Sequence, residues 1–350
     1  MSKQSTDASG SPATCVHALD LCVFGAGAVG GYLAALLAEA GTHRVSVIAR
    51  GAHLDAIRAR GLEVVDSNGR RRVSFAAAEE SAGQLPQQDI VFVTVKAHSQ
   101  PALAGNLSAL LKPEGHAVFI SNGVPWWWSS GLQNPSDHPM LVDPNGLLRN
   151  QLGPSRVLGG VVYSANEVTS PGTVVHQANN HWVIGEPTNE LTLRLGRTVD
   201  VLREAGLHAE ASTDLRQQVW KKLLRNTPFN SLCALTRLNA GEFGREPPLI
   251  ALAQALIDEV RSVARAMGWN LPESRAADIV ASGGSISGAR ATGKPSMLQD
   301  ALASRSMELD AIVGQVQQFA RQVAVPTPVL DNVYALLRGL DLSFRTATSP

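Results

Sequence analysis

The N-terminal half of the chain alternates short apolar runs with stretches of helical periodicity. Residues 20–41 predict a strand, a glycine-rich turn and an amphipathic helix. Further strands are predicted at residues 43–50, 89–96 and 116–123, a short helix at 52–61, and a hairpin at 62–75 with Asn68-Gly69 at its turn. Because strands alternate with helices, the pattern predicts an α/β fold with a doubly wound, Rossmann-type parallel sheet.

The middle of the chain has a different pattern. Residues 125–154 contain the sequence PWWW, several prolines and glycines, and little periodicity, which predicts an extended insertion. Two strands joined at Ser170-Pro171-Gly172 are predicted within residues 156–177, followed by strands at 181–187 and 207–212 and a helix near 190–205.

Strand signals stop after about Ser212, and apolar residues then recur at helical spacing. Helices are predicted at residues 214–226, 247–267, 272–281, 297–322 and 327–340. The sequence therefore predicts a loose N-terminal tail at 1–18, a Rossmann-type domain at 19–211 and an all-helical domain at 212–345.

Composition excludes several classes of protein. Lys+Arg and Asp+Glu both number 30, so the basic excess expected of a nucleic-acid-binding protein is missing. No apolar run approaches the roughly 18 residues that a membrane span needs. Cys15, Cys22 and Cys233 are few and far apart, which favours a reducing cytoplasm over a disulfide framework or a metal site. The tail, rich in Ser, Thr and Ala, lacks the apolar segment of a signal peptide.

The glycine-rich turn has the pattern G-x-G-x-x-G. Its residues are Gly25, Ala26, Gly27, Ala28, Val29 and Gly30. The motif follows a predicted strand and opens a helix, which is the context of a dinucleotide-binding loop whose helix N-terminus receives the pyrophosphate. The alternative is a tight strand-to-helix turn that binds no ligand.

Polar residues follow the predicted strands where ligands bind in open α/β sheets. Arg50 stands at the end of the second strand, where NAD-binding proteins usually have an acidic residue, so it favours the 2′-phosphate of NADP(H). A solvated arginine is the alternative. Lys96 and Asn122 lie just past the carboxyl ends of two further strands, and together with the glycine loop they favour cofactor contact over an ordinary polar loop.

Most of the segment 217–232 has the periodicity of a packed helix, and Lys222, Asn226 and Asn230 stand four residues apart on one face of it. A nicotinamide cofactor supplies a hydride but no proton, so the reduction of a ketone needs a positioned acid. Partial burial beside Trp220 and Leu223 would lower the pKa of Lys222 into a range useful for proton donation. A solvated helix face is the alternative.

Two more candidates stand near the C-terminal end. Ser296 precedes an apolar helix and has Gln299 three residues on, the pattern of a capping box, although a helix start also suits a substrate carboxylate. Glu308 lies among apolar residues and is either a charge at the edge of a helix or a carboxylate that pairs with a cation such as Lys222.

The motifs GAGAVGG, VTVKAH, SNG, VWKKLLRNTPFN, SMLQD and MELD occur in this order, and together they resemble the ketopantoate reductase (2-dehydropantoate 2-reductase) family. The resemblance extends from about Leu19 to Leu340. It implies a Rossmann-type NADP-binding domain joined to a helical substrate and catalytic domain. It also implies the NADPH-dependent reduction of ketopantoate to pantoate, a step toward coenzyme A, in the cleft between the two domains.

The resemblance assigns roles to the matching residues. Lys222 corresponds to the catalytic lysine, which is the proton donor, and Glu308 to a glutamate near that lysine and the cofactor. Asn122 corresponds to an asparagine that contacts both cofactor and substrate. The other matches are the substrate-binding Asn226, Asn230 and Ser296 and the cofactor-contacting Lys96 and Ala165.

Two features depart from the family pattern. The family commonly has a further substrate asparagine where this chain has Ala240, with Asn239 one residue earlier. Trp126, Trp127 and Trp128 belong to a longer stretch after Asn122, and they either form a wall over the pocket or pack the insertion onto the domain. If they line the pocket, the acceptor is a larger or more apolar 2-keto acid.

The sequence is also compatible with two other functions. One is reduction of a different, larger ketone or imine on the same fold, and the other is a non-catalytic NADP(H)-binding sensor. The amphipathic helices after residue 296 fit either a homodimer interface or an intramolecular core.

Overall fold

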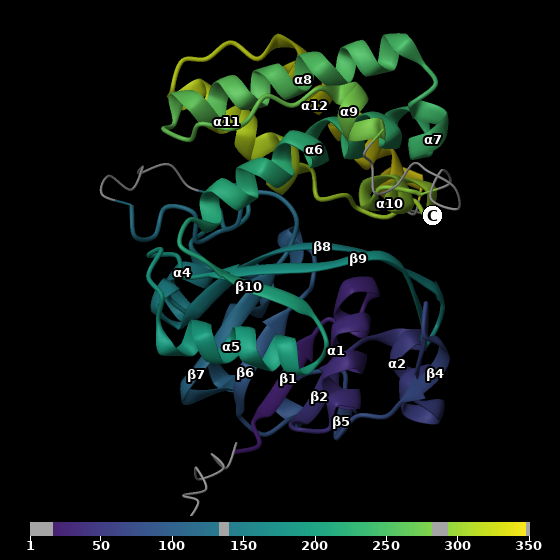
Figure 1. Ribbon diagram of the computed structural model, residues 1–350, viewed down its shortest axis with the longest axis vertical. Coiled ribbons are helices and arrows are strands. Elements are labelled where there is room, and N and C mark those ends of the chain that lie inside the picture. The colour runs from purple at the N-terminus through teal and green to yellow at the C-terminus, as the bar shows by residue number, and fades with distance from the viewer. Residues whose placement is uncertain (1–16, 133–139, 282–292, 348–350) are drawn as a thin grey trace, which may run out of the picture.

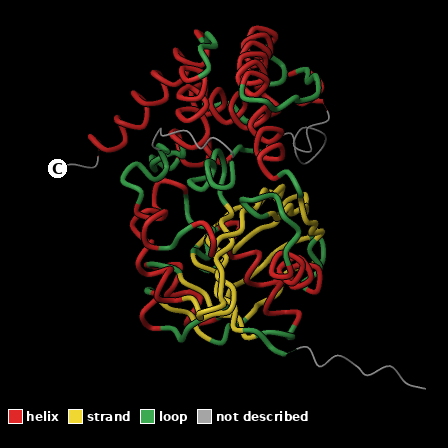
Figure 2. The backbone as a smooth tube through the Cα atoms, turned by 90° about the vertical axis from the view of Figure 1, so that its left-hand side faces the viewer, coloured by secondary structure: helices red, strands yellow, loops and turns green. Residues whose placement is uncertain are grey.

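The computed structural model describes residues 17–132, 140–281 and 293–347. Most of the predicted tail, Cys15 and residues 133–139 of the predicted insertion lie outside the described residues. The described chain forms a sheet of ten strands, and helices α6 to α12 stack above this sheet (Figure 1). A view turned by 90° shows the same separation of strands and C-terminal helices (Figure 2).

The sheet is built around a parallel core. β1 (Asp20–Phe24) lies between β2 (Arg44–Ile48) and β6 (Gln88–Val93), and β7 (Leu111–Ile120) follows β6, all of them parallel. The full order is β4-β3-β9-β8-β7-β6-β1-β2-β5, with β10 paired to β9. The remaining strands are β3 (Leu62–Asp66), β4 (Gly69–Val73), β5 (Ala77–Glu79), β8 (Val157–Ser170), β9 (Thr173–Gly185) and β10 (His208–Ser212). The parallel-dominated sheet and the helical C-terminal region confirm the predicted fold class.

Alternation along the central strands explains how the sheet is buried on both faces. On β1, Leu21 and Val23 belong to one apolar cluster and Cys22 and Phe24 to another. Successive side chains of a strand point to opposite faces, so each strand contributes to both cores. The first core includes apolar residues of α1 (Ala28–Ala40) and α5 (Leu193–Glu204), and the second continues into the C-terminal helices. The shorter helical elements of this part are α2 (Gly51–Arg60), α3 (Ala104–Leu110), α4 (Leu147–Gln151) and the 3₁₀ turns Ala82–Gln84, Ala97–Ser99, Pro101–Leu103 and Pro154–Arg156.

The hairpin of β8 and β9 differs from the prediction. Two separate strands were expected within residues 173–187, but β9 runs without interruption from Thr173 to Gly185 and pairs antiparallel with β8. The polar residues between the two apolar segments remain in the strand although the pairing with β8 is irregular there: the register shifts between Tyr163 and Ala165, and Asn179 has φ 62. The long hairpin borders α6 at the top of the sheet (Figure 1).

The C-terminal helices are α6 (Leu215–Thr236), α7 (Ala240–Phe243), α8 (Pro247–Ala266), α9 (Ala276–Ala281), α10 (Ser296–Leu302), α11 (Gln315–Gln322) and α12 (Pro328–Ala347). The predicted end of the first helix at residue 226 is wrong, because α6 continues through Pro228, whose ring the packed helix accommodates. The single helix predicted at 297–322 is also wrong. It is divided into α10 and α11, with a π-helical turn at Asp310–Gly314 directly before α11.

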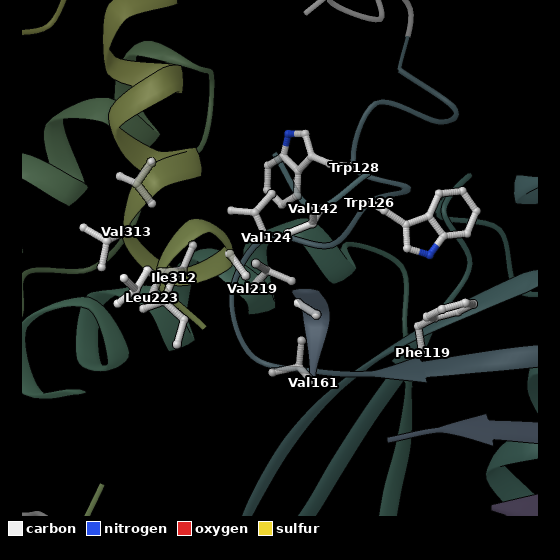
Figure 3. Packing of buried hydrophobic residues seen from close by; sticks show 14 of the residues in the cluster. Phe119, Val124, Trp126, Trp128, Val142, Val161, Val219, Leu223, Ile312 and Val313 are labelled. Atoms are coloured by element: carbon white, nitrogen blue, oxygen red, sulfur yellow. The ribbon is translucent and has the colours of Figure 1, made fainter. Parts of the chain in front are cut away.

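The tryptophans of the predicted insertion pack into the core. Trp126, Trp127 and Trp128 are each at most 2% exposed. Trp126 lies edge-on to Phe119 of β7 (Figure 3). Trp128 lies edge-on to Trp220 of α6. None of the three tryptophans lines the large cleft of the molecule, so of the two alternatives the structure shows the one in which they pack the insertion onto the domain.

Candidate active site

A cleft of about 1660 Å³ lies between the sheet and the C-terminal helices. Its walls include the glycine loop, the ends of β6 and β7, the β8–β9 hairpin, the middle of α6, and α10 with the residues after it. The carboxyl ends of the parallel strands open into this cleft, which is the usual ligand position in an open α/β sheet. Of the residues predicted for the site, all except Gly30 line the cleft: Gly25, Ala26, Gly27, Ala28, Val29, Arg50, Lys96, Asn122, Ala165, Lys222, Asn226, Asn230, Ser296 and Glu308.

Two of the three glycines in the loop have no room for a side chain, whereas the third has free space beside it. A Cβ on Gly25 would lie 2.6 Å from a methyl group of Val95, and one on Gly30 would lie 2.2 Å from the hydroxyl of Thr94. A Cβ on Gly27 would meet only the carbonyl of Gly25, at 4.0 Å. Packing within the protein therefore requires Gly25 and Gly30. At Gly27 the protein leaves open the space through which a pyrophosphate would reach the N-terminus of α1.

Arg50 precedes α2 at the rim of the cleft. Its side chain is exposed and makes no hydrogen bond or ion pair with any described residue. The guanidinium is thus available to an anionic group of a ligand bound on the glycine loop.

Lys96 connects the sheet to the C-terminal helices. Its ammonium lies 2.6 Å from a carboxylate oxygen of Asp300 on α10 and donates to the carbonyl of Ser306 at 3.1 Å. Asp300 also pairs with Arg305 at 3.3 Å. Lys96 lines the cleft, but in this structure its charge is balanced by a buried aspartate of the helical region.

Lys222 lies inside the cleft. Its ammonium donates to the carbonyl of Val162 at 2.7 Å and lies 5.7 Å from the ring centre of Tyr163. Burial lowers the pKa of Lys222 to about 8, although the negative charge of Glu308 acts in the opposite direction. At neutral pH the ammonium therefore still carries its proton, and it releases that proton more readily than an exposed lysine does.

Glu308 is buried just before the π-helical turn, where it joins three segments. One carboxylate oxygen accepts from the backbone N–H of Ala97 at 3.0 Å, and the other accepts from the amide of Asn122 at 3.2 Å. Burial raises its pKa, and the hydrogen bonds from Ala97 and Asn122 oppose that increase. The expected direct pairing with Lys222 is not observed among the described residues. The carboxylate affects the lysine through its charge.

The amides of α6 face the same cleft and are joined to its other walls. Asn226 donates to the side-chain oxygen of Asn122 at 3.4 Å. The side-chain oxygen of Asn230 accepts from the hydroxyl of Ser296 at 3.3 Å and from the backbone N–H of Met297 at 3.2 Å. Ser296 is the first residue of α10, and Pro295 is its N-cap without a side-chain hydrogen bond. The capping box expected of Ser296 and Gln299 is therefore absent from the described structure, and the hydroxyl faces the cleft instead.

The two departures from the family pattern have different outcomes. Ala240 lines the cleft, whereas the side chain of Asn239 accepts from the backbone N–H groups of Gly241 and Glu242 and so caps α7. Asn239 is occupied as a helix cap and does not replace an asparagine at position 240.

Many further residues that the sequence analysis did not select line the cleft, and some of them carry side chains suited to chemistry or binding. Among these are His53 on α2, Tyr163 on β8 and Arg225 on α6. Arg225 follows Lys222 at helical spacing, so the periodicity of α6 could have indicated it. No local pattern predicts the positions of His53 and Tyr163, because they reach the cleft through the pairing of distant segments.

A Rossmann-type sheet, a glycine loop that opens its first helix, and a buried lysine in the adjoining cleft together define a nucleotide-binding oxidoreductase fold. Comparison with known proteins then gives the family. Residues 21–189 match the family described as "Ketopantoate reductase PanE/ApbA". Residues 214–341 match the family described as "Ketopantoate reductase PanE/ApbA C terminal". The chain belongs to the ketopantoate reductase family and is an oxidoreductase of the 2-dehydropantoate 2-reductase type.

Individual relatives agree with this assignment. The 2-dehydropantoate 2-reductase of Mesorhizobium japonicum is 38% identical over 326 residues, which are 92% of this chain and 98% of that protein. The structure of a candidate ketopantoate reductase from Ralstonia solanacearum MolK2 has a TM-score of 0.84 at 31% identity, covering 94% of this chain and 99% of that one. D-mandelate dehydrogenase with NADH and anilino(oxo)acetate has a TM-score of 0.78 at 19% identity over 93% and 99% of the two chains, a likeness of fold alone.

No helix within the described ranges is both long and apolar enough to cross a bilayer.

Proposed function

We propose that this protein reduces 2-dehydropantoate (ketopantoate), or a closely related 2-keto acid, to the 2-hydroxy acid with NADPH. The observation that carries the proposal is the position of Lys222. Its ammonium lies in the same cleft as the glycine loop, among side chains that suit a small polar acid. The names of the relatives support the choice of substrate.

The residues around the glycine loop fit a dinucleotide. Gly27 leaves the approach to α1 open, and the N–H groups at the start of that helix suit a pyrophosphate. Arg50 would hold the 2′-phosphate, so NADP(H) is favoured over NAD(H). When bound, the cofactor supplies a hydride for C2 of the keto acid.

The side chains of the chain itself would do the remaining work. Lys222 stabilises the oxygen at C2 as negative charge develops there, and then protonates it. The carbonyl of Val162 and the ring of Tyr163 hold its ammonium in the cleft. Glu308 favours the protonated lysine through its charge and holds Asn122 in place.

The polar groups of α6 and α10 would bind the substrate. Asn226, Asn230 and Ser296 present amide and hydroxyl groups to its carboxylate and hydroxyl. Because Ser296 and Asn230 already bond to each other, the substrate would meet a hydroxyl and an amide whose orientations are set beforehand.

A panel of 2-keto acids, followed by NADPH absorbance, tests the substrate. Ketopantoate or a close homologue should give the highest kcat/KM. A larger ketone or an imine as the best substrate would replace the proposed acceptor, and NADPH binding without turnover across the panel would indicate a sensor.

The cofactor preference is tested separately with Arg50→Ala. Loss of one charge-assisted contact of about 1.4 kcal/mol should raise KM for NADPH roughly 10-fold and leave KM for NADH nearly unchanged. The matched control is Arg70→Ala, which removes an exposed arginine that pairs with Glu63 on β3, outside the cleft. An equal effect of Arg50→Ala on both cofactors would remove the argument for NADP(H).

A further inference from the structure

His53 connects the glycine loop to a distant part of the chain. It lies on α2, and its Nε2 lies 2.7 Å from the carbonyl oxygen of Ala26 in the loop. Its Nδ1 accepts from the backbone N–H of Gly172 at 3.0 Å, in the turn between β8 and β9. The ring lines the cleft on the same helix that Arg50 precedes.

These two partners determine the protonation of the ring. A backbone N–H can only donate, so Nδ1 must present its lone pair to Gly172. A carbonyl can only accept, so Nε2 must carry the hydrogen toward Ala26. The geometry therefore requires the neutral ring with its proton on Nε2. A second proton on Nδ1 would point at the N–H of Gly172 and break that bond.

The bond to Ala26 acts on the part of the loop where a ligand would approach. The carbonyl of Ala26 and the N–H of Gly27 belong to one planar peptide, so holding the carbonyl also orients Gly27. The neighbouring Gly25 is held separately, because the hydroxyl of Thr94 donates to its carbonyl at 2.8 Å. The N–H of the Ala26–Gly27 peptide donates within the loop to the carbonyl of Gly25 at 2.7 Å, and His53 is the described side chain that holds its carbonyl.

The turn on the other side of His53 is held in place as well. Gly172 has φ +76, and a Cβ there would lie 2.7 Å from the Cβ of Ala56. Arg60, at the end of α2, donates to the carbonyl of Pro171 at 2.7 Å. The hairpin turn therefore gives His53 a fixed support against which it holds the loop.

We propose that His53 is a positioning residue for the dinucleotide, which holds the Ala26–Gly27 peptide in its binding orientation only while the imidazole is neutral. The proposal rests on the proposed function, because it takes the glycine loop to be the cofactor site. It concerns binding, and it gives His53 no part in proton transfer.

The surroundings of His53 define the expected pH dependence. Burial lowers the pKa of His53, and the bond to Ala26 opposes that decrease. The other charged or titratable side chains on the elements around it are Arg50 just before α2, Asp55, Arg58 and Arg60 on α2, Tyr32 and Glu39 on α1, Glu79 on β5, and Tyr163, Glu167, His176 and His181 on the hairpin. A histidine with a lowered pKa makes its neutral-state contribution at neutral pH and loses it as the pH falls through the folded-state pKa. Dinucleotide affinity should therefore weaken in acid.

Two variants separate the two hydrogen bonds. His53→Gln keeps an N–H that can donate to Ala26, and His53→Asn keeps an oxygen that can accept from Gly172. Neither titrates near neutral pH. The measurement is the Kd of NADPH and of NADH by calorimetry between pH 5.5 and 8, together with the melting temperature of each variant. His43→Gln is the matched control, because Nδ1 of His43 also accepts a backbone N–H, that of Leu19, away from the cleft.

At pH 8, His53→Asn should raise Kd roughly 10-fold, as expected for about 1.4 kcal/mol, whereas His53→Gln should stay within about 3-fold of wild type. As the pH falls from 8 towards 5.5, the wild-type Kd should rise more steeply than that of His53→Gln, because only the imidazole gains a proton. The 2′-phosphate of NADPH also titrates near pH 6, but this contribution is common to both proteins and does not occur with NADH.

Equal pH profiles for wild type and His53→Gln, or an undisturbed Kd in His53→Asn, would overturn the inference while the proposed function stands. If the His53 variants showed a lower melting temperature with an unchanged Kd, as expected for His43→Gln, the role of His53 would be purely structural. Failure of the wild-type protein to bind either dinucleotide would overturn the proposed function and this inference with it.

Discussion

Two cationic side chains lie six residues apart on α6, and their surroundings differ completely. Arg216 is 1% exposed, and its guanidinium donates to the carbonyls of Trp128 at 2.7 Å, of Pro187 at 2.9 Å and of Ser130. Lys222 donates to one carbonyl, and the rest of its ammonium faces the cleft. Burial lowers the pKa of both, to about 10 for Arg216 and about 8 for Lys222.

The comparison shows that burial of a charge does not by itself indicate chemistry. Arg216 stays charged at neutral pH, and its donors are used to join α6 to the tryptophan segment and to the loop after β9. Its charge also lies 5.7 Å and 5.8 Å from the rings of Trp127 and Trp128. Lys222 has a pKa within reach of neutral pH and donor capacity directed at a cleft, which are the properties that proton donation requires.

Substitution of the lysine should have the largest effect. Lys222→Ala is expected to lower kcat by at least ~100-fold, as loss of a general acid should, while NADPH binding and the melting temperature survive. Steady-state kinetics and calorimetry measure this, with Lys221→Ala as the control because Lys221 is the exposed neighbour. Near wild-type turnover in Lys222→Ala would reject the assignment.

Substitution of Arg216 should lower the stability of the protein and leave kcat nearly unchanged, the reverse of the result expected for Lys222. Arg216→Met leaves three carbonyls, two of them fully buried, without their donor and is expected to lower the free energy of unfolding by about 2 kcal/mol, roughly 30-fold in the equilibrium constant. Urea denaturation measures the loss, and kcat should be nearly unchanged at temperatures where the variant is folded. Lys221→Met serves as the control on the same helix. A large loss of kcat with intact stability would mean that Arg216 belongs to the site.

The pH dependence of kcat should give a smaller but more specific effect. Proton donation needs the charged form of Lys222, so kcat for reduction should fall as the pH rises through about 8. Glu308→Gln removes a negative charge that raises the pKa of the lysine, and it should move this fall to lower pH. Glu246→Gln, at an exposed position before α8, should leave the profile in place. An unmoved profile in Glu308→Gln would separate the glutamate from the lysine.

Local patterns in the sequence were sufficient where the determining interactions are local. The glycine loop and its strand and helix were predicted because a tight turn and the start of a helix depend on neighbouring residues. The polar face of α6 was predicted because residues at four-residue spacing share one side of any helix. The end of α6 was missed since tertiary packing allows Pro228 within the helix, which local rules disfavour.

Long-range packing decided the features that local patterns left open. PWWW is compatible with a pocket wall or with a core, and only the arrangement of α6 and β7 placed its tryptophans in the core. The partners of Glu308 are Ala97 and Asn122, both more than 180 residues away, and they could not be inferred from spacing. His53 likewise shows no local signal, because its two partners come from different segments.

The sequence by itself determined the class of fold and the set of polar residues available for chemistry, because periodicity and turn residues act over a few positions. Only the tertiary structure decided which of two buried cations holds the chain together and which one faces the cleft. That difference depends on the carbonyls and rings that distant segments bring to each side chain, and distance along the chain carries no information about them.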